Sequence, residues 1–126
     1  MKNIQVVPFE PSMLADAATL LAARHARHRV AHPELPSRFE DPSAARVAVE
    51  AELDRSESIG VAAVVDGRLA GCLIVDVAED YLGDPTAWMR LAGHALDEGV
   101  PAEMYRQLYA AAAESLPSRG CFDHYV

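Results

Sequence analysis

The stretch that decides the fold is SIGVAAVVDGRLAGCLIVDV, residues 58–77. Two runs rich in β-branched residues, 58–65 and 68–77, flank Asp66–Gly67. An Asp-Gly pair in this setting predicts a two-residue hairpin turn, because both central residues need a positive φ. The sequence therefore places two long antiparallel strands at the centre of the chain.

Upstream of the hairpin, the pattern predicts one short strand and two helices. Residues 4–9 (IQVVPF) indicate a strand, with Pro8 at its end or at a sheet edge. Pro11 and Ser12 are typical of a helix start, with Ser12 as the cap. At helical spacing, one apolar face is formed by Met13, Leu14, Ala17, Leu20 and Leu21. The next position on that face is Arg24, so we expect the stripe to end at Leu21.

This first helix should stop at His32–Pro33, because a residue before proline avoids the helical conformation. Asp41–Pro42 then predicts the cap and first turn of a second helix. Downstream of the hairpin we expect a loop over 78–87, a third sheet segment over Trp88–Leu96, a helix over about 101–115 and a last strand over 121–126. The predicted order is β-α-α-β-β-β-α-β, an α/β fold of the α+β kind.

Composition limits the class of protein. The 126 residues suffice for one domain, and 51% are apolar and 24% charged, as is usual for soluble globular proteins. A formal net charge of −8 argues against nucleic acid as a partner. No apolar run reaches the ~20 residues of a membrane span, and the first residues form no signal peptide, so we expect a cytoplasmic protein. Cys72 and Cys121 share no metal-like spacing and are expected to be reduced thiols.

The element order, with VAAVVDGRLAGCLIVDV (residues 61–77) at its centre, resembles the first two-thirds of the GNAT family of acyl-CoA-dependent N-acetyltransferases. The resemblance implies a mixed, mostly antiparallel sheet with flanking helices. It implies acetyl-CoA as the cofactor of the intact family, with the third sheet segment presenting its backbone to the pantetheine arm. It also implies a following loop that wraps the pyrophosphate at the next helix N-terminus. By position, the cofactor-binding residues would be Gly93, His94, Ala95 and Gly99.

The loop itself departs from the family pattern. Residues 97–103 (DEGVPAE) offer one glycine, Gly99, whereas the family's loop is glycine-rich so that its backbone can approach the phosphates. Pro101 has no N–H, and Asp97, Glu98 and Glu103 carry the same charge sign as a phosphate. Acidic residues at a helix start more simply complement the helix dipole. We therefore expect a degenerate coenzyme loop and no acetyl-CoA bound by this chain alone.

Three histidines on the first helix, His25, His28 and His32, have the i, i+3, i+7 spacing of residues on one face, where imidazoles can bind zinc. Arginines crowd the same turns, and cations at a helix C-terminus are favoured by the helix dipole without any metal. We expect a solvated basic helix end and no metal site. A contact with a phosphate or an acidic partner is the weaker hypothesis.

Other candidate groups have simpler structural readings. His94 could lie near a substrate amine, but we expect a structural histidine, and we expect Tyr105 and Tyr109 to be packed or half-exposed rather than catalytic. Acidic residues after the hairpin could attract an amine but read as a solvated loop; they are Asp76, Glu79 and Asp80. Cys72 lies between apolar neighbours and is expected to be a buried thiol. The sequence identifies no catalytic residue.

The favoured interpretation is one GNAT-like domain, residues 1–126, incomplete at its C-terminus, from a protein that moves acetyl groups from acetyl-CoA to an amine. This segment would be inactive alone. The alternative is a non-catalytic packing or dimerisation module that kept the fold and lost the cofactor site. A sensor built on the histidine-rich helix is a third option. CFDHYV (residues 121–126) should form an open sheet edge, so we expect self-association, or a second domain of the same longer chain as the partner.

Overall fold

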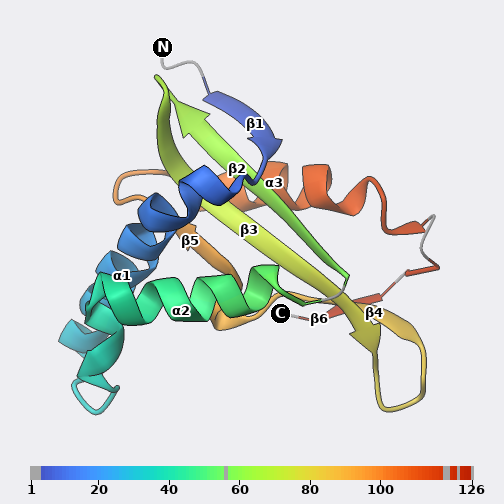
Figure 1. Ribbon diagram of the computed structural model, residues 1–126, viewed down its shortest axis with the longest axis horizontal. Helices are drawn as coiled ribbons and strands as arrows, with labels where there is room; N and C mark the ends of the chain where they lie inside the picture. Colours follow the sequence, from blue (N-terminus) through green and yellow to red (C-terminus); the bar gives the residue numbers. More distant parts are fainter. Residues whose placement is uncertain (1–3, 56, 118–119, 122, 126) are drawn as a thin grey trace.

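The computed structural model describes residues 4–55, 57–117, 120–121 and 123–125. Figure 1 shows three helices around one twisted sheet. The elements, in chain order, are β1 (Ile4–Pro8), α1 (Leu14–Ala31), α2 (Pro42–Leu53), β2 (Ser58–Val65), β3 (Arg68–Glu79), β4 (Pro85–Trp88), β5 (His94–Leu96), α3 (Met104–Ala113) and β6 (Asp123–Tyr125). Short 3-10 turns lie at Pro11–Met13, Ser37–Glu40 and Leu91–Gly93. No helix of the described residues is both long and apolar enough to cross a membrane.

The predicted hairpin is confirmed and forms the centre of the sheet. Asp66 has φ 52° and Gly67 has φ 77°, as the turn requires. The strands lie in the order β1-β2-β3-β4-β6, and β5 pairs with β3 beyond the end of β4. All pairs are antiparallel except β4 with β6, which is parallel. The mixed, mostly antiparallel sheet predicted from the sequence is therefore confirmed.

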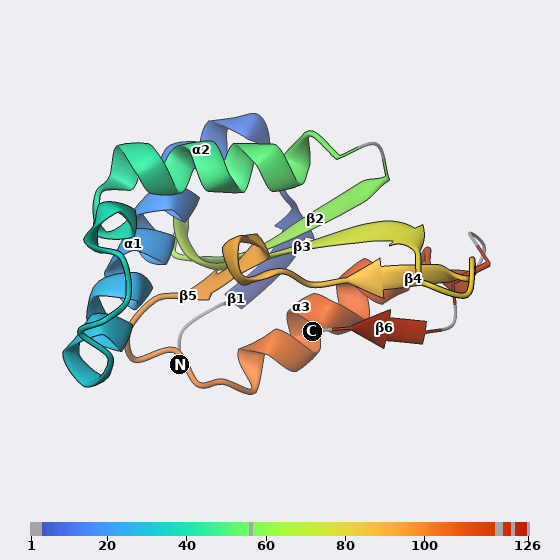
Figure 2. The same ribbon diagram turned by 90° about the horizontal axis from the view of Figure 1, so that it is seen from below.

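Helices cover both faces of this sheet, as Figure 2 shows. Alternate residues of β2 and β3 point to opposite faces. On one face, Ala62, Cys72 and Ile74 join a buried cluster with α1 and α2. On the other face, Ala63 and Leu73 join a cluster with α3. The two clusters form the core.

Helix α1 differs from the prediction at both ends of its apolar stripe. A 3-10 turn precedes the helix, and Ser12 lies inside that turn, so the expected Ser12 cap is wrong. The stripe also does not end at Leu21. Arg24 continues it and is only 9% exposed. The second helix follows its prediction, because the Asp41 carboxylate accepts a hydrogen bond from the Ser43 N–H at 3.0 Å.

The single strand predicted over residues 88–96 is wrong, and so is part of the loop predicted over 78–87: β4 begins at Pro85 and ends at Trp88, and β5 covers only His94–Leu96. The chain leaves the sheet after β4, makes the turn Leu91–Gly93 and returns as β5. A Cβ at Gly93 would lie 2.8 Å from the Ile74 carbonyl oxygen, so this close return needs glycine. The Arg90 guanidinium lies 3.1 Å from the Asp76 carboxylate on β3, and this contact helps fix the break.

Candidate functional site at the free edge of strand β5

The backbone of β5 has a free edge facing away from β3. The Asp97 N–H donates to the Ala70 carbonyl at 2.8 Å, and Ala95 lies opposite Cys72 in the same antiparallel register. Hydrogen-bonding direction alternates along a strand, so the backbone groups of His94 and Leu96 point away from β3. Strand β6 pairs with β4, and no described strand pairs with this edge of β5. The edge is therefore open to side chains or to a ligand.

Arginines from α1 cover this edge. The Arg24 guanidinium donates to the His94 carbonyl and, at 2.7 Å, to the Leu91 carbonyl. One turn later, Arg27 makes a longer contact of 3.5 Å with the Leu96 carbonyl. Figures 1 and 2 show the second half of α1 alongside β5, which allows these contacts. Side chains of the first helix thus take the acceptors that a neighbouring strand would otherwise use.

Tyr105 reaches the same place from α3, on the other face of the sheet. Its ring lies edge-on to His94 with centroids 5.4 Å apart, and its hydroxyl interacts with the Arg24 guanidinium. Burial raises the pKa of Tyr105, and Arg24 opposes that shift. Tyr105 is half-buried, as expected, but it belongs to this cluster, which its sequence position on a helix did not reveal.

His94 is held in one tautomer. Its Nδ1 lies 3.0 Å from the Arg90 carbonyl oxygen, which can only accept, so Nδ1 carries the proton and Nε2 accepts when the ring is neutral. Burial lowers the pKa of His94, and the charge of Arg24 lowers it further, whereas the hydrogen bond to Arg90 opposes the change. A neutral imidazole of this kind can take a proton from a bound group.

Cys72 adds no nucleophile to the site. It is 3% exposed, and burial raises the pKa of its thiol to about 12. A thiol that stays protonated at neutral pH is unreactive. The expectation of a buried thiol is confirmed, and the groups able to do chemistry here are His94, Tyr105 and Arg24.

The four residues expected to bind the cofactor by position occupy two different places. The Gly93 backbone packs against Ile74, and the His94 carbonyl accepts a hydrogen bond from Arg24. Ala95 pairs with Cys72 of β3. Gly99 lies apart, in the following loop, with φ 86°. The first three lie in β5 or directly before it, with only His94 on the free edge, and the fourth lines a separate pocket.

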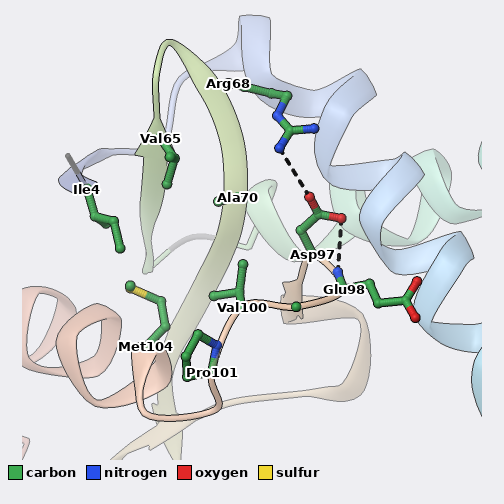
Figure 3. A pocket seen from close by; sticks show the side chains of 10 residues that line it. Ile4, Val65, Arg68, Ala70, Asp97, Glu98, Val100, Pro101 and Met104 are labelled. Atoms are coloured by element: carbon green, nitrogen blue, oxygen red, sulfur yellow. Dashed lines mark hydrogen bonds and ion pairs between the residues drawn. The ribbon is translucent and has the colours of Figure 1, made fainter. Parts of the chain in front are cut away.

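That pocket, shown in Figure 3, has a volume of about 180 Å³. Its wall is mainly apolar, and its charged residues Arg68, Asp97 and Glu98 lie together on one side. Asp97 lies 3.7 Å from Arg68 of the hairpin and accepts the Glu98 N–H at 2.9 Å. The pocket therefore lies between the loop after β5 and the β2–β3 hairpin, and the Arg68–Asp97 ion pair forms part of its wall.

The three histidines of α1 have different partners. His25 is buried, donates from Nε2 to the Pro36 carbonyl at 2.6 Å and packs edge-on to Phe39. His28 is exposed, and His32 lies 3.3 Å from Glu34. In the part of the chain that is described, no group of three histidine, cysteine or acidic residues could hold a metal ion. The expectation of a solvated helix end is wrong for two residues: Arg24 is buried against the turn and strand at Leu91 and His94, and His25 is buried against Pro36 and Phe39.

The acidic residues after the hairpin also need a correction. Asp76 is 5% exposed and is paired with Arg90, so it is not part of a solvated loop. Arg90 lies 3.6 Å from Glu52, which is 6% exposed and also holds Arg55 at 3.1 Å. This buried ion-pair network links α2, β3 and the broken third segment. Asp80 instead accepts the N–H groups of Leu82 and Asp84 and orders the next turn.

Three solved structures share the fold of this chain at 15–16% sequence identity. No protein-family model matches the chain, and no curated protein sequence is similar to it. An acetyltransferase from Vibrio fischeri superposes with a TM-score of 0.71 at 15% identity, covering 97% of this chain and 93% of the other. A ribosomal-protein-alanine N-acetyltransferase from Brucella melitensis biovar Abortus 2308 gives 0.64 at 15% identity, covering 97% and 77%.

An aminoglycoside N-acetyltransferase, AAC(6')-Iy, solved in complex with CoA, gives a TM-score of 0.65 at 16% identity, covering 98% of this chain and 76% of its own. These similarities extend over nearly the whole chain. The chain has the GNAT acetyltransferase fold.

Proposed function

We propose that this chain is a domain of an acyl-CoA-dependent N-acetyltransferase, and that it does not itself hold acetyl-CoA. The intact protein would transfer the acetyl group from acetyl-CoA to an amine by direct attack on the thioester. One observation carries the proposal: Arg24 donates to the His94 carbonyl on the free edge of β5 and to the Leu91 carbonyl in the turn just before it. By the family resemblance, that edge is the one that would face the pantetheine arm.

The loop after β5 supports the same conclusion. Two of its N–H groups are used inside the loop, because Glu98 donates to the Asp97 carboxylate and Val100 donates to the Asp97 carbonyl at 3.1 Å. Pro101 has no N–H. A phosphate at this position would meet few free donors and the carboxylates of Asp97 and Glu98.

The start of α3 is also poorly suited to an anion. The N–H groups of Met104, Tyr105 and Arg106 donate to carbonyls three residues earlier, each at 3.0 Å. A helix N-terminus binds phosphate through N–H groups that have no partner inside the chain. Here the tight first turn has already used three of them.

Calorimetric titration of acetyl-CoA into the chain tests the proposal. We expect no heat of binding at micromolar concentrations, because the strand edge and the loop donors are both occupied. A dissociation constant in the low micromolar range would overturn the proposal and make this chain a cofactor-binding enzyme in its own right.

The alternative is a packing or dimerisation module that has no part in acetyl transfer. The same titration, repeated with any stable complex that the chain forms with a second copy, separates the two. If a complex binds acetyl-CoA and acetylates an amine, the chain is a contributing domain. If no complex binds acetyl-CoA or acetylates an amine, the chain is better described as a packing module.

A further inference from the structure

Arg24 carries a buried positive charge without a carboxylate partner. Its side chain is 9% exposed, and its Nε is buried with no hydrogen-bond acceptor among the described residues. Its other contacts are neutral, namely two backbone carbonyls and the Tyr105 hydroxyl. Buried charges in proteins are normally paired, because removing an ion from water is costly. The charge of Arg24 therefore lacks a counter-ion.

The other buried charges of this chain do have counter-ions. Glu52 and Asp76 are both held by arginines within the network around Arg90. The chain has 19 acidic residues against 11 basic ones, so carboxylates are plentiful. The loop next to Arg24 carries Asp97, yet that carboxylate turns toward Arg68, as Figure 3 shows. The missing counter-ion is thus a feature of this place and not of the chain as a whole.

Two further basic side chains lie near Arg24 on the same helix. Arg27 and His28 follow on the same face of α1, at i+3 and i+4, and both are exposed. Arg27 has only the 3.5 Å contact with the Leu96 carbonyl and no ion pair in the described structure. The charge of Arg24 acts on both His28 and His94, which places these rings within its field. Arg24, Arg27 and His28 form what we call the cationic edge cluster.

We propose that the cationic edge cluster binds an oxyanion, the carboxylate or phosphate group of a small ligand, with Arg27 and His28 reaching it from solvent and Arg24 behind them. A guanidinium presents planar pairs of N–H donors that match the two oxygens of such a group. Arg27 is free to turn from its long carbonyl contact toward the anion. The site does not depend on whether the chain takes part in acetyl transfer.

A side-chain NMR titration tests the site directly. The Arg24 Nε–H, which is buried and without an acceptor, should give a slowly exchanging signal. Adding inorganic phosphate or acetate at constant ionic strength should shift this signal together with the backbone amides around residues 24–28 and 94–96. Sodium chloride serves as the reference. Saturable shifts confined to this region with either oxyanion support the proposal. Shifts that never saturate, or that chloride reproduces, overturn it.

Two matched variants make the test independent of any general salt effect. Arg27→Gln removes one exposed cation of the cluster, and Arg46→Gln makes the same change on the exposed face of α2. Phosphate stabilises many proteins by exclusion from their surface, and that effect should be equal in all three chains. We expect oxyanion binding to be about tenfold weaker in Arg27→Gln and unchanged in Arg46→Gln. Equal affinity in both variants would overturn the proposal.

Discussion

The Arg24 side chain makes polar contacts with residues far away in the sequence. Its two carbonyl partners lie 67 and 70 positions away in the sequence. At the scale of single residues, it joins the first helix to the broken third strand segment. Replacing Arg24 should therefore affect both the first helix and the broken third segment.

Replacing Arg24 with leucine should lower the free energy of unfolding by about 1–3 kcal/mol, because the Leu91 and His94 carbonyls lose their donors. Arg24→Lys should not restore the loss, since an ammonium cannot match the fork of a guanidinium. Urea unfolding monitored by circular dichroism measures both. Arg27→Leu is the control and should change stability by less than about 0.5 kcal/mol. A fully stable Arg24→Leu protein would show that the carbonyls do not need this side chain.

Protonation of His94 should make the free energy of unfolding depend on pH. Its pKa is lowered in the folded protein, first by burial and then by Arg24, so the unfolded chain takes up this proton at higher pH. The folded state is then favoured above the ordinary histidine pKa of about 6.5, and stability falls as pH drops below it, until the folded ring also titrates. Urea unfolding at pH 7.5 and pH 5.5 should show a smaller loss for His94→Gln than for the natural chain. An NMR titration giving the His94 ring a pKa above that of a free histidine would contradict this account.

At the scale of elements, the broken third segment depends on Arg90. This side chain is 30% exposed, but the Glu52 and Asp76 side chains that it pairs with are 8% and 7% exposed. Removing it leaves Asp76 as a buried charge without its arginine, whereas Glu52 keeps Arg55.

Arg90→Gln should therefore cost about 3 kcal/mol, the lower end of the range for breaking a buried ion pair. The matched control is Arg68→Gln, which removes the Arg68–Asp97 pair; Arg68 is 72% exposed, and such surface pairs contribute less than about 1 kcal/mol. Chemical denaturation of both variants gives the comparison. Equal losses would mean that Arg90 does not hold the break in the strand.

Elements set by neighbouring residues could be predicted from the sequence, and those set by distant contacts could not. The turn at Asp66–Gly67 depends only on the positive φ of these two residues, and the cap at Asp41–Pro42 depends only on the residues next to it. Both predictions, the hairpin and the start of the second helix, are therefore confirmed. The break after β4 depends on Arg90 meeting Glu52, 38 positions earlier, and no local pattern marks it. The sequence predicts the candidate site only in part. It indicates His94 as a single histidine, and it places Arg24 at the end of an apolar stripe, because the burial of a charge cannot be inferred from residue spacing.

At the scale of the whole molecule, the sheet ends at β6. Among the described strands, β6 pairs only with β4, so one side of its backbone has no strand partner. Such an edge is a template for another chain unless charges or proline protect it.

We therefore expect the chain to self-associate through this edge, most simply as a two-fold dimer. Sedimentation velocity at micromolar concentration should show a dimer, and Tyr125→Lys should shift it toward the monomer by placing a charge on the edge. A chain that remains monomeric at these concentrations would show that the edge is not used in this way.

The two-residue turn at Asp66–Gly67 also sets the order in which the molecule assembles. It brings β2 and β3 together through the shortest possible loop, and β4 and β5 can pair only after β3 is in place. Short loops close first because they lose least chain entropy, so this hairpin should be formed in the transition state for folding.

Gly67 and Gly99 offer a matched pair for kinetics, since both have φ near +80° and open space around a new Cβ. Alanine at either position should cost about 1 kcal/mol. In stopped-flow experiments, Gly67→Ala should slow folding about fivefold, whereas Gly99→Ala should mainly speed unfolding. The reverse result would mean that the chain starts to fold elsewhere and that the hairpin closes late.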